Sequence, residues 1–429
     1  MDKYSVISVI SSFTGVVIMR EMAYYERPLE YKALLDIKKA ATLRKSSREG
    51  MGSLKRFPAS LDMLNFLPAQ LHNFPLNAEE PVNTATILGK RSSKPVGLDT
   101  PILISAMSFG ALNRENKIAL AKASALAGTA ANTGEGGMLD EEREFAKYLT
   151  LQYSTGHFGI WEERLKQADM IEFRISQSAY PATGSFVPAS KVTELIAKTR
   201  GIVVHTEARS PARHPDVDSA EDLKQKIATL RDISEGKPIG IKFAAGHIEK
   251  DLDLIIYAEP DYIVVDGFGG GSGAPPSHIR DNFGVPIINF LPRAHRYLDQ
   301  IGYRTQVELV AAGGLRTSGD FAKCLALGAD AVYIATAALW AMSCEYYRIC
   351  ETNQCPTGTT TSDPDLVKRF NVDRGAKKLA NFVQVSTQEL ADISRAVGKN
   401  DVHKLDKHDL VALTRETSEL SGVHYPALT

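Results

Sequence analysis

The chain of 429 residues has only four cysteines and no excess of charge of either sign. Four cysteines cannot form the disulfide framework of a secreted protein, so we expect a reducing, cytoplasmic location. With 50 Lys and Arg residues against 51 Asp and Glu, the chain lacks the basic surplus that holds a phosphate backbone, and nucleic acid is not an expected partner. The 32 glycines and 20 prolines are ordinary numbers, which excludes collagen-like and disordered chains.

Long hydrophobic runs are also missing. Residues 6–19 form an uncharged run of 14 residues, but a bilayer span needs about 20 residues. A signal peptide would begin with more basic residues and end at a small-residue cleavage site. Because charged, helix-like sequence follows, we expect a buried or interfacial N-terminal helix, with membrane association through this run as the alternative.

Short apolar runs recur from residue 101 onward, separated by helical stretches and glycine-rich loops. Continuous apolar runs suit parallel strands that are buried on both faces, and eight runs over roughly 235 residues match a (β/α)8 barrel. A doubly wound sheet, the rival, more often has about five or six strands. We therefore predict an α/β fold, a (β/α)8 TIM barrel with N-terminal and C-terminal extensions. The eight runs are residues 102–106, 129–132, 170–175, 202–205, 239–243, 262–265, 307–311 and 331–334.

This reading divides the chain into four parts. Residues 1–90 form a helical and irregular extension, 91–343 the barrel, 344–360 a cysteine-containing loop, and 361–429 a helical C-terminal extension. Binding and catalytic residues of such barrels lie in the loops after the carboxyl ends of the strands. The loops of this chain at those positions are rich in glycine and polar residues, so we expect the site there.

The loops after the last two predicted strands match a phosphate site. Such loops commonly bind phosphate through backbone N–H groups. Gly313 and Gly314 permit close backbone approach because neither has a Cβ, and Ala335 and Thr336 follow the last strand. We predict that these four residues bind a phosphate group, with two ordinary turn glycines as the alternative.

A second glycine-rich loop, residues 267–273, includes Gly270 and Gly271 and contains a loose G-x-G-x-x-A pattern. A dinucleotide-binding fingerprint must open a helix, whereas this loop runs into Pro275 and Pro276. We therefore reject dinucleotide binding here and predict that the backbone approaches a flat ligand ring. A merely flexible loop is the alternative.

Three of the four cysteines, Cys344, Cys350 and Cys355, fall within 12 residues, and a proline follows the last. Structural zinc usually takes four ligands in paired C-x-x-C spacing, which is absent. Three thiolates with a trailing proline are typical of iron–sulfur ligation, and three ligands suit a three-iron, four-sulfide cluster. Zinc and free thiols remain as alternatives. Cys324 lies on an apolar helical face, so we expect it in the core.

Together these motifs resemble the FMN-binding synthase domain of glutamate synthase. The resemblance covers about residues 95–360, through MSFGAL, NTGEGG, the loop containing KF, DGFGGGSGA, AAGGLRTSGD and C-x5-C-x4-C-P-x-G. It implies a TIM barrel that holds FMN beside a 3Fe-4S cluster. It also implies an activity, the reduction of 2-iminoglutarate, made from 2-oxoglutarate and ammonia, to L-glutamate.

The resemblance also implies roles for individual residues. Lys242 would lie near the pyrimidine side of the flavin, where a fixed cation stabilises the anionic reduced ring. Glu135, in NTGEGG, would handle protons or ammonia; loop solvation is the alternative for this carboxylate. The other flavin contacts would come from Ser105, Met107, Ser108, Asn132 and Gln177.

Two loops depart from the family pattern. Where the family has K-P-G-E-G-G, this chain has YPATGS at residues 180–185, so the family's lysine and glutamate are absent. The loop at residues 209–216 is closer to a sister group, the flavin subunit of glutamate N-methyltransferase (N-methylglutamate synthase). Arg209 and Arg213 in this loop offer forked donors suited to a substrate carboxylate. Ion pairs of these arginines with Glu207 or Asp216 are the alternative.

The motifs that are absent predict partners. The glutaminase of a full glutamate synthase needs an N-terminal nucleophilic cysteine, but the first cysteine is Cys324, and no nicotinamide-binding domain is visible. We therefore expect an oligomeric synthase module that takes electrons from a ferredoxin or an NAD(P)H-oxidising subunit. A separate amidotransferase subunit is a possible source of ammonia.

Three rival functions remain from the sequence. The first is an N-methylglutamate synthase-type subunit that acts on methylamine and glutamate. The second is an FMN-barrel dehydrogenase or isomerase of the inosine-monophosphate or isopentenyl type. The inosine-monophosphate type would need a nucleophilic cysteine in a loop near the phosphate, and the glycine-rich loop has none. The third is an electron-transfer subunit without its own substrate turnover.

Overall fold

A computed structural model describes residues 28–426 of the chain. Eight parallel strands form one sheet, in the order β4-β13-β12-β11-β10-β7-β6-β5. The first and last strands of this order lie beside each other, where the Thr129 hydroxyl donates to the Ile102 carbonyl at 2.6 Å. The predicted (β/α)8 barrel is therefore confirmed. Its strands are β4 (Ile102–Ile104), β5 (Ala130–Asn132), β6 (Tyr148–Tyr153), β7 (Met170–Arg174), β10 (Ile239–Ala244), β11 (Tyr262–Asp266), β12 (Glu308–Ala312) and β13 (Ala331–Ile334).

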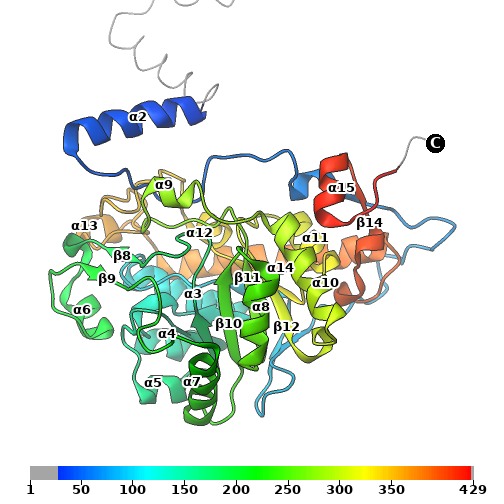
Figure 1. Cartoon of the computed structure of the whole chain (residues 1–429), viewed down its shortest axis with the longest axis horizontal. Helices are drawn as coiled ribbons and strands as arrows, with labels where there is room; N and C mark the ends of the chain where they lie inside the picture. The colour runs from blue at the N-terminus through cyan, green and yellow to red at the C-terminus, as the bar shows by residue number, and fades with distance from the viewer. Residues whose placement is uncertain (1–27, 427–429) are drawn as a thin grey trace, which may run out of the picture.

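Helices surround this barrel, as Figure 1 shows. Several begin at a side chain that caps the first turn: Asn113, Ser219 and Thr317 each accept a hydrogen bond from a backbone N–H group three residues further on, as good N-cap residues do. The helices are α3 (Arg114–Leu126), α4 (Asp140–Phe145), α5 (Glu162–Gln167), α6 (Glu194–Arg200), α7 (Ala220–Ile233), α8 (Ile248–Tyr257), α9 (Ser277–Arg280), α10 (Ile287–Gln300), α11 (Ser318–Ala326) and α12 (Thr336–Met342). Short 3-10 turns are η3 (Gly134–Gly136), η4 (Ala189–Lys191) and η5 (Arg304–Gln306).

One predicted strand is wrong and one was missed. Residues 202–205 are not a strand; Val203 is exposed, while Ile202 and Val204 pack in a small apolar cluster beside α6. The missed strand is β6, which lies between β5 and β7; Thr150 and Gln152 interrupt its apolar pattern because they face the barrel interior. Consequently residues 175–219 form one long connection from β7 to α7, containing β8 (Phe186–Val187) and β9 (Ala208–Arg209).

The segments on either side of the barrel are joined to each other. Strand β1 (Leu64–Phe66), after η2 (Leu61–Met63), pairs with β14 (Leu410–Ala412), and α14 (Val372–Ala396) packs against α3, α11 and α12. The remaining elements are α2 (Pro28–Leu43), drawn above the barrel in Figure 1, β2 (Thr86–Leu88), β3 (Val96–Leu98), α13 (Pro364–Val367), η6 (Val402–Lys404), η7 (Lys407–Asp409) and α15 (Arg415–Ser421). Helix α2 contacts the rest of the chain through Lys32, whose ammonium lies 3.8 Å from Asp281.

The predicted N-terminal helix over residues 6–19 lies outside the described residues. Within residues 28–426, no helix combines the length and the apolar character that crossing a membrane requires.

The barrel interior changes character from one end to the other. At the amino ends of the strands, apolar side chains such as Met170 and Val310 pack with Leu88 and Leu98 of the β2–β3 hairpin, which closes that end. Towards the carboxyl ends, the inward positions become polar, because side chains alternate in and out along a strand. These inward polar residues are Ser105, Asn132, Gln152, Glu172, Arg174, Lys242 and Asp266, and all are buried. This alternation places the chemistry at the carboxyl end of the barrel.

Candidate active site

Two adjoining cavities open at the carboxyl ends of the barrel strands. Their empty volumes are about 960 Å³ and about 500 Å³, including their open mouths. Ala106, Gln177, Gly271, Ala335 and Thr336 line both cavities. The two cavities therefore form one continuous site, large enough for a cofactor and a small substrate.

The structure brings most of the predicted flavin residues to this site. Eleven of the twelve line one or both cavities: Ser105, Met107, Ser108, Gln177, Lys242, Gly270, Gly271, Gly313, Gly314, Ala335 and Thr336. Asn132 is the exception and lies beneath the cavities. Its side chain accepts a hydrogen bond from the Gly134 N–H group at 2.9 Å and donates to Glu172 at 3.2 Å.

A buried polar network forms the floor of the site. Glu172 Oε1 accepts hydrogen bonds from Gln152 at 2.7 Å and from Asn132 at 3.2 Å, while its second oxygen has no partner. Sequence reasoning missed Glu172 and Gln152. The signal was available, since a glutamate inside the apolar run MIEF is costly to bury unless a polar site receives it.

Lys242 enters the site from β10. Its ammonium group is buried, 3.4 Å from the Asp266 carboxylate and 5.6 Å from the centre of the Tyr333 ring. Asp266 also accepts a hydrogen bond from the Ser178 hydroxyl at 2.7 Å. The cation is therefore fixed at a strand end, beside the smaller cavity, and within residues 28–426 Asp266 is the one carboxylate that pairs with it.

Bare backbone forms one wall of the site. Gly313 and Gly314 have φ angles of +113° and +74°, which L-residues rarely adopt. A Cβ on Gly313 would lie 2.1 Å from the Gly267 carbonyl oxygen, and one on Gly271 would lie 2.3 Å from the Gly52 nitrogen. Three chain segments thus meet backbone to backbone, leaving a surface without side chains, as a flat ring or a phosphate requires.

Glu135 takes part in a buried charged cluster that also lines the larger cavity. One of its carboxylate oxygens lies 3.3 Å from Arg174 and 3.3 Å from the Tyr180 hydroxyl, and Arg174 donates to that hydroxyl at 2.6 Å. Burial alone would raise the pKa of Glu135, but Arg174 and the hydroxyls of Ser185 and Ser210 outweigh it and lower the pKa. Glu135 is therefore ionised at neutral pH, and its other oxygen, Oε1, has no hydrogen-bond partner.

Arg174 and Tyr180 were not identified from the sequence, although both carry strong signals. Arg174 is a charged residue on a buried strand, and Tyr180 stands where the family pattern has its lysine. Burial raises the pKa of Tyr180, and Arg174 offsets this only in part, so the phenol stays protonated. A second buried cation, Arg200, holds the Phe109 carbonyl at 3.0 and 2.8 Å and acts electrostatically on Glu135.

The two arginines predicted to bind substrate lie outside the cavity linings. Arg213 is exposed and pairs with Asp218 at 2.9 Å. Arg209 pairs with Glu207 at 2.9 Å, and its guanidinium lies 4.4 Å from the centre of the Phe186 ring, which lines the larger cavity. Substrate binding by these arginines stays a prediction that their ion pairs do not support.

The three clustered cysteines are free thiols beside the site. Cys355 is buried, Cys344 and Cys350 are partly buried, and Cys350 lines the larger cavity. Their sulfur atoms do not all lie within 4.8 Å of one another, whereas one tetrahedral zinc ion would bring thiolates to about 3.8 Å. Among the described residues, the three thiols are therefore not arranged as donors to a single metal ion. Cys324 is fully buried in α11.

A buried lysine lies beside the cysteines. Lys191 donates to the carbonyl oxygens of Ala111 at 3.0 Å and Cys350 at 3.3 Å. Among the described residues it forms no ion pair with a carboxylate, and burial lowers the pKa of Lys191 to about 8. A buried cation of this kind calls for a nearby anion, and thiolates bound to a cluster would supply one.

Comparison with known proteins agrees with this geometry. The conserved region in glutamate synthase matches residues 34–400. The chain is 37% identical over 409 residues to a "Glutamate synthase large subunit-like protein" of Rhizobium meliloti (strain 1021), covering 91% of this chain and 92% of the relative. It is 34% identical over 417 residues to an "Archaeal-type glutamate synthase" described as NADPH-dependent, from Thermotoga neapolitana, covering 91% of this chain and 82% of the relative.

Solved structures share the barrel. A flavocytochrome b2 with pyruvate bound superposes with a TM-score of 0.54 at 16% identity, covering 86% of this chain and 79% of that one. A mandelate oxidase with an FMN adduct gives a TM-score of 0.50 at 16% identity, covering 80% and 86%. These likenesses show the fold, while the family follows from the sequence matches. This chain belongs to the glutamate synthase family of oxidoreductases.

Proposed function

We propose that this chain is an FMN-dependent, glutamate synthase-type enzyme that reduces 2-iminoglutarate, formed from 2-oxoglutarate and ammonia, to L-glutamate. The observation that carries the proposal is one connected site. Glu135, Lys242 and Cys350 line cavities that adjoin at the carboxyl end of the barrel, together with most of the residues assigned to flavin. A proton-handling group, a cation and a cluster ligand therefore share one site.

The residues present fit FMN. The side-chain-free wall formed by Gly271, Gly313 and Gly314 would accommodate a ring and a phosphate, with Thr336 beside them. Bound FMN would supply reversible two-electron, hydride-transferring chemistry. Lys242, buried and fixed at the end of β10, would stabilise the negative charge of the reduced cofactor without having to reorganise.

The cysteine loop fits an iron–sulfur cluster with three protein ligands. Cys344, Cys350 and Cys355 would hold a 3Fe-4S cluster, which would supply one-electron transfers. The uncompensated ammonium of Lys191, within 3.3 Å of the Cys350 carbonyl, would stabilise the negative charge of that cluster. Electrons would come from a ferredoxin or an NAD(P)H-oxidising subunit.

The buried charged cluster suits an iminoglutarate substrate. Arg174 and Arg200 are cations near the larger cavity that can attract a substrate carboxylate. Glu135 is ionised and lines the larger cavity, and one of its carboxylate oxygens has no partner. This oxygen can accept a proton from ammonium or stabilise a protonated imine. Condensation of ketone and ammonia releases water; the imine carbon then gains a hydride and the nitrogen a proton.

One observation favours a second candidate, an N-methylglutamate synthase-type reaction of methylamine and glutamate. Tyr180 occupies the position of the family lysine and is engaged by Arg174 and Glu135, so one cation available to the family's substrate is missing here. A substrate with different charge would suit this site. An electron-transfer subunit without turnover is the third candidate.

One experiment separates the three candidates. The holoprotein is reduced anaerobically with dithionite and mixed with 2-oxoglutarate and ¹⁵N-ammonium. In a parallel reaction the oxidised holoprotein is mixed with methylamine and glutamate, because glutamate must first give a hydride to the flavin before the N-methylimine can be reduced. We expect flavin reoxidation together with ¹⁵N-labelled L-glutamate, detected by mass spectrometry, in the first reaction only. N-methylglutamate in the second reaction would favour the sister activity. Reduced flavin that stays reduced in the first reaction yet is oxidised by an added one-electron acceptor, together with no product in the second reaction, would favour the electron-transfer subunit.

The matched control for this experiment is Glu163→Gln, on the exposed face of α5. It makes the same chemical change as Glu135→Gln but lies far from the cavity linings. Product formation lost in Glu135→Gln and kept in Glu163→Gln assigns the reaction to this site.

A further inference from the structure

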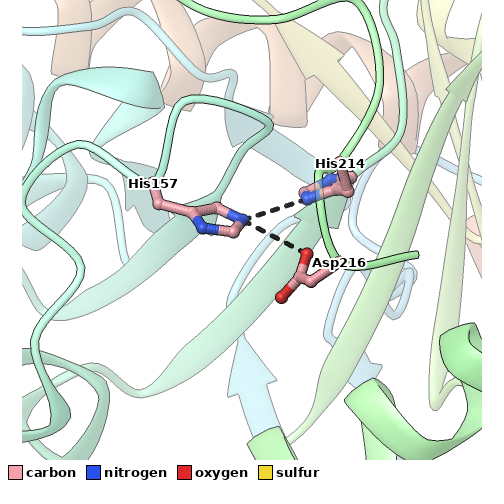
Figure 2. A group of neighbouring side chains, drawn as sticks. All are labelled: His157, His214 and Asp216. Carbon is pink, nitrogen blue, oxygen red and sulfur yellow. Dashed lines mark hydrogen bonds and ion pairs between the residues drawn. The ribbon is translucent and has the colours of Figure 1, made fainter.

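A cluster of two histidines and one aspartate lies outside both cavities, between the carboxyl ends of β6 and β7 and the segment that leads into α7. We propose that His157, His214 and Asp216 form a binding site for a divalent transition-metal ion of the zinc class. Figure 2 shows the three side chains converging on one point. The proposal is independent of the function proposed above.

The spacing of the donor atoms fits one ion. His157 Nε2 lies 3.3 Å from His214 Nδ1 and 3.7 Å from Asp216 Oδ1, and all three donor atoms lie within 4.8 Å of one another. Zinc bonds of about 2.0–2.1 Å at tetrahedral angles separate neighbouring ligand atoms by about 3.3–3.4 Å. The two contacts of His157 are therefore already within a few tenths of an ångström of the separations that one ion requires, and a fourth position is left for water.

Second contacts orient two of the three ligands. His214 Nε2 lies 2.9 Å from the Arg174 carbonyl oxygen, so this nitrogen carries the hydrogen and Nδ1 presents its lone pair to the cluster. Lys226 lies 2.6 Å from Asp216 Oδ2 and leaves Oδ1 facing the histidines. Partners of this kind fix ligand orientation in known metal sites.

Both imidazole rings lie in surroundings that favour the uncharged ring. The His214 ring is buried against Phe173, with ring centres 4.1 Å apart, and burial lowers the pKa of His214 to about 4. Burial also lowers the pKa of His157. The neighbouring groups that act on the cluster include Tyr153 and two cations, Lys226 and Arg174.

The backbone conformation of His157 is one that residues with a side chain rarely adopt. Its φ angle is +48°, a region that costs a side-chain-bearing residue free energy and is found at functional sites. This conformation turns the imidazole toward the segment with His214 and Asp216. A bound ion would clip two connections, after β6 and before α7, next to the strand that carries Arg174.

Cobalt binding tests the site on the untagged holoprotein, after removal of adventitious metal with a chelator. We expect one equivalent of Co²⁺ to give visible d–d bands without a thiolate charge-transfer band, and Zn²⁺ to displace it. His157→Asn and Asp216→Asn should each weaken binding at least about tenfold, since a ligand is lost. Asparagine tolerates the left-handed backbone of residue 157, so this variant separates ligation from folding.

His205→Asn is the matched control. His205 is exposed and also has a positive φ, of +57°, but it belongs to no such cluster, and its replacement should leave Co²⁺ affinity unchanged. The proposal is overturned if Co²⁺ does not bind, if a thiolate band shows that it binds the cysteines, or if His157→Asn and Asp216→Asn bind as tightly as the wild type. In the first case the 3.3 Å contact is simply a hydrogen bond between the two imidazoles.

Discussion

Replacing Lys117 with methionine tests how the fold holds the site together. Lys117 lies on α3, and its buried ammonium is 2.9 Å from Glu142 on α4. It also donates to the carbonyl oxygens of Met107 at 2.6 Å and Thr133 at 2.9 Å, in the loops after β4 and β5. One side chain thus ties two loops of the predicted flavin site to a helix.

The expected loss can be estimated from this arrangement. Methionine replaces most of the apolar stem of the side chain, one heavy atom shorter, but leaves Glu142 buried without its cation. Removing one partner of a buried ion pair costs about 3–5 kcal/mol. Burial already raises the pKa of Glu142, so the variant would protonate it to limit the loss. Against a total stability of about 5–15 kcal/mol, the decrease is large. Looser loops should also weaken FMN retention.

Urea unfolding followed by circular dichroism, together with flavin content after gel filtration, measures both effects. The matched control is Lys122→Met on the same helix, where Lys122 pairs at 2.7 Å with an exposed carboxylate of Asp373. An exposed pair contributes only about 0–1 kcal/mol. Adding Glu142→Gln to Lys117→Met should recover part of the loss. Equal losses in the Lys117 and Lys122 variants would refute the reasoning.

The barrel could be predicted because most of its strands are short, buried and continuous in their apolar character. The exception shows the limit of that signal. Strand β6 directs Thr150 and Gln152 into the polar end of the barrel, which breaks its apolar pattern. Residues 202–205 are apolar for another reason, since Ile202 and Val204 pack in a small cluster beside α6. An apolar run can also belong to a small, partly exposed cluster, so the run alone does not show that it lies in the sheet.

The backbone part of the site was also predictable. Gly271 and Gly313 are required where a Cβ would strike a neighbouring backbone, and this requirement is local enough to appear as a motif. The charged part of the site could not be predicted from the sequence. Glu135 and Tyr180 are 45 residues apart, and only the closed barrel brings both to Arg174. The exposure of Arg213 likewise depends on the path of a long connection, which no residue pattern specifies.

Four further outcomes are expected at the site. Gly314→Asp, which adds a side chain and a negative charge at a φ of +74°, should abolish FMN binding; a variant with full flavin absorbance would locate the phosphate elsewhere. Serine at any of the three clustered cysteines should remove iron and the cluster EPR signal, while Cys324→Ser should keep both; four irons per chain would argue against a three-iron cluster. Lys242→Met should lower the flavin midpoint potential, because the reduced, anionic ring loses a stabilising cation. Each loss of about 1.4 kcal/mol corresponds to about 30 mV for a two-electron couple. An unchanged potential would mean that Lys242 does not lie beside the ring. Glu135→Gln should keep the flavin but lower kcat about 10²–10⁴-fold, as loss of a proton-transferring group does. The ionised carboxylate with its unpartnered oxygen is replaced by a neutral amide, which cannot accept the proton. Turnover equal to the wild type would mean that Glu135 serves only to balance the charge of Arg174.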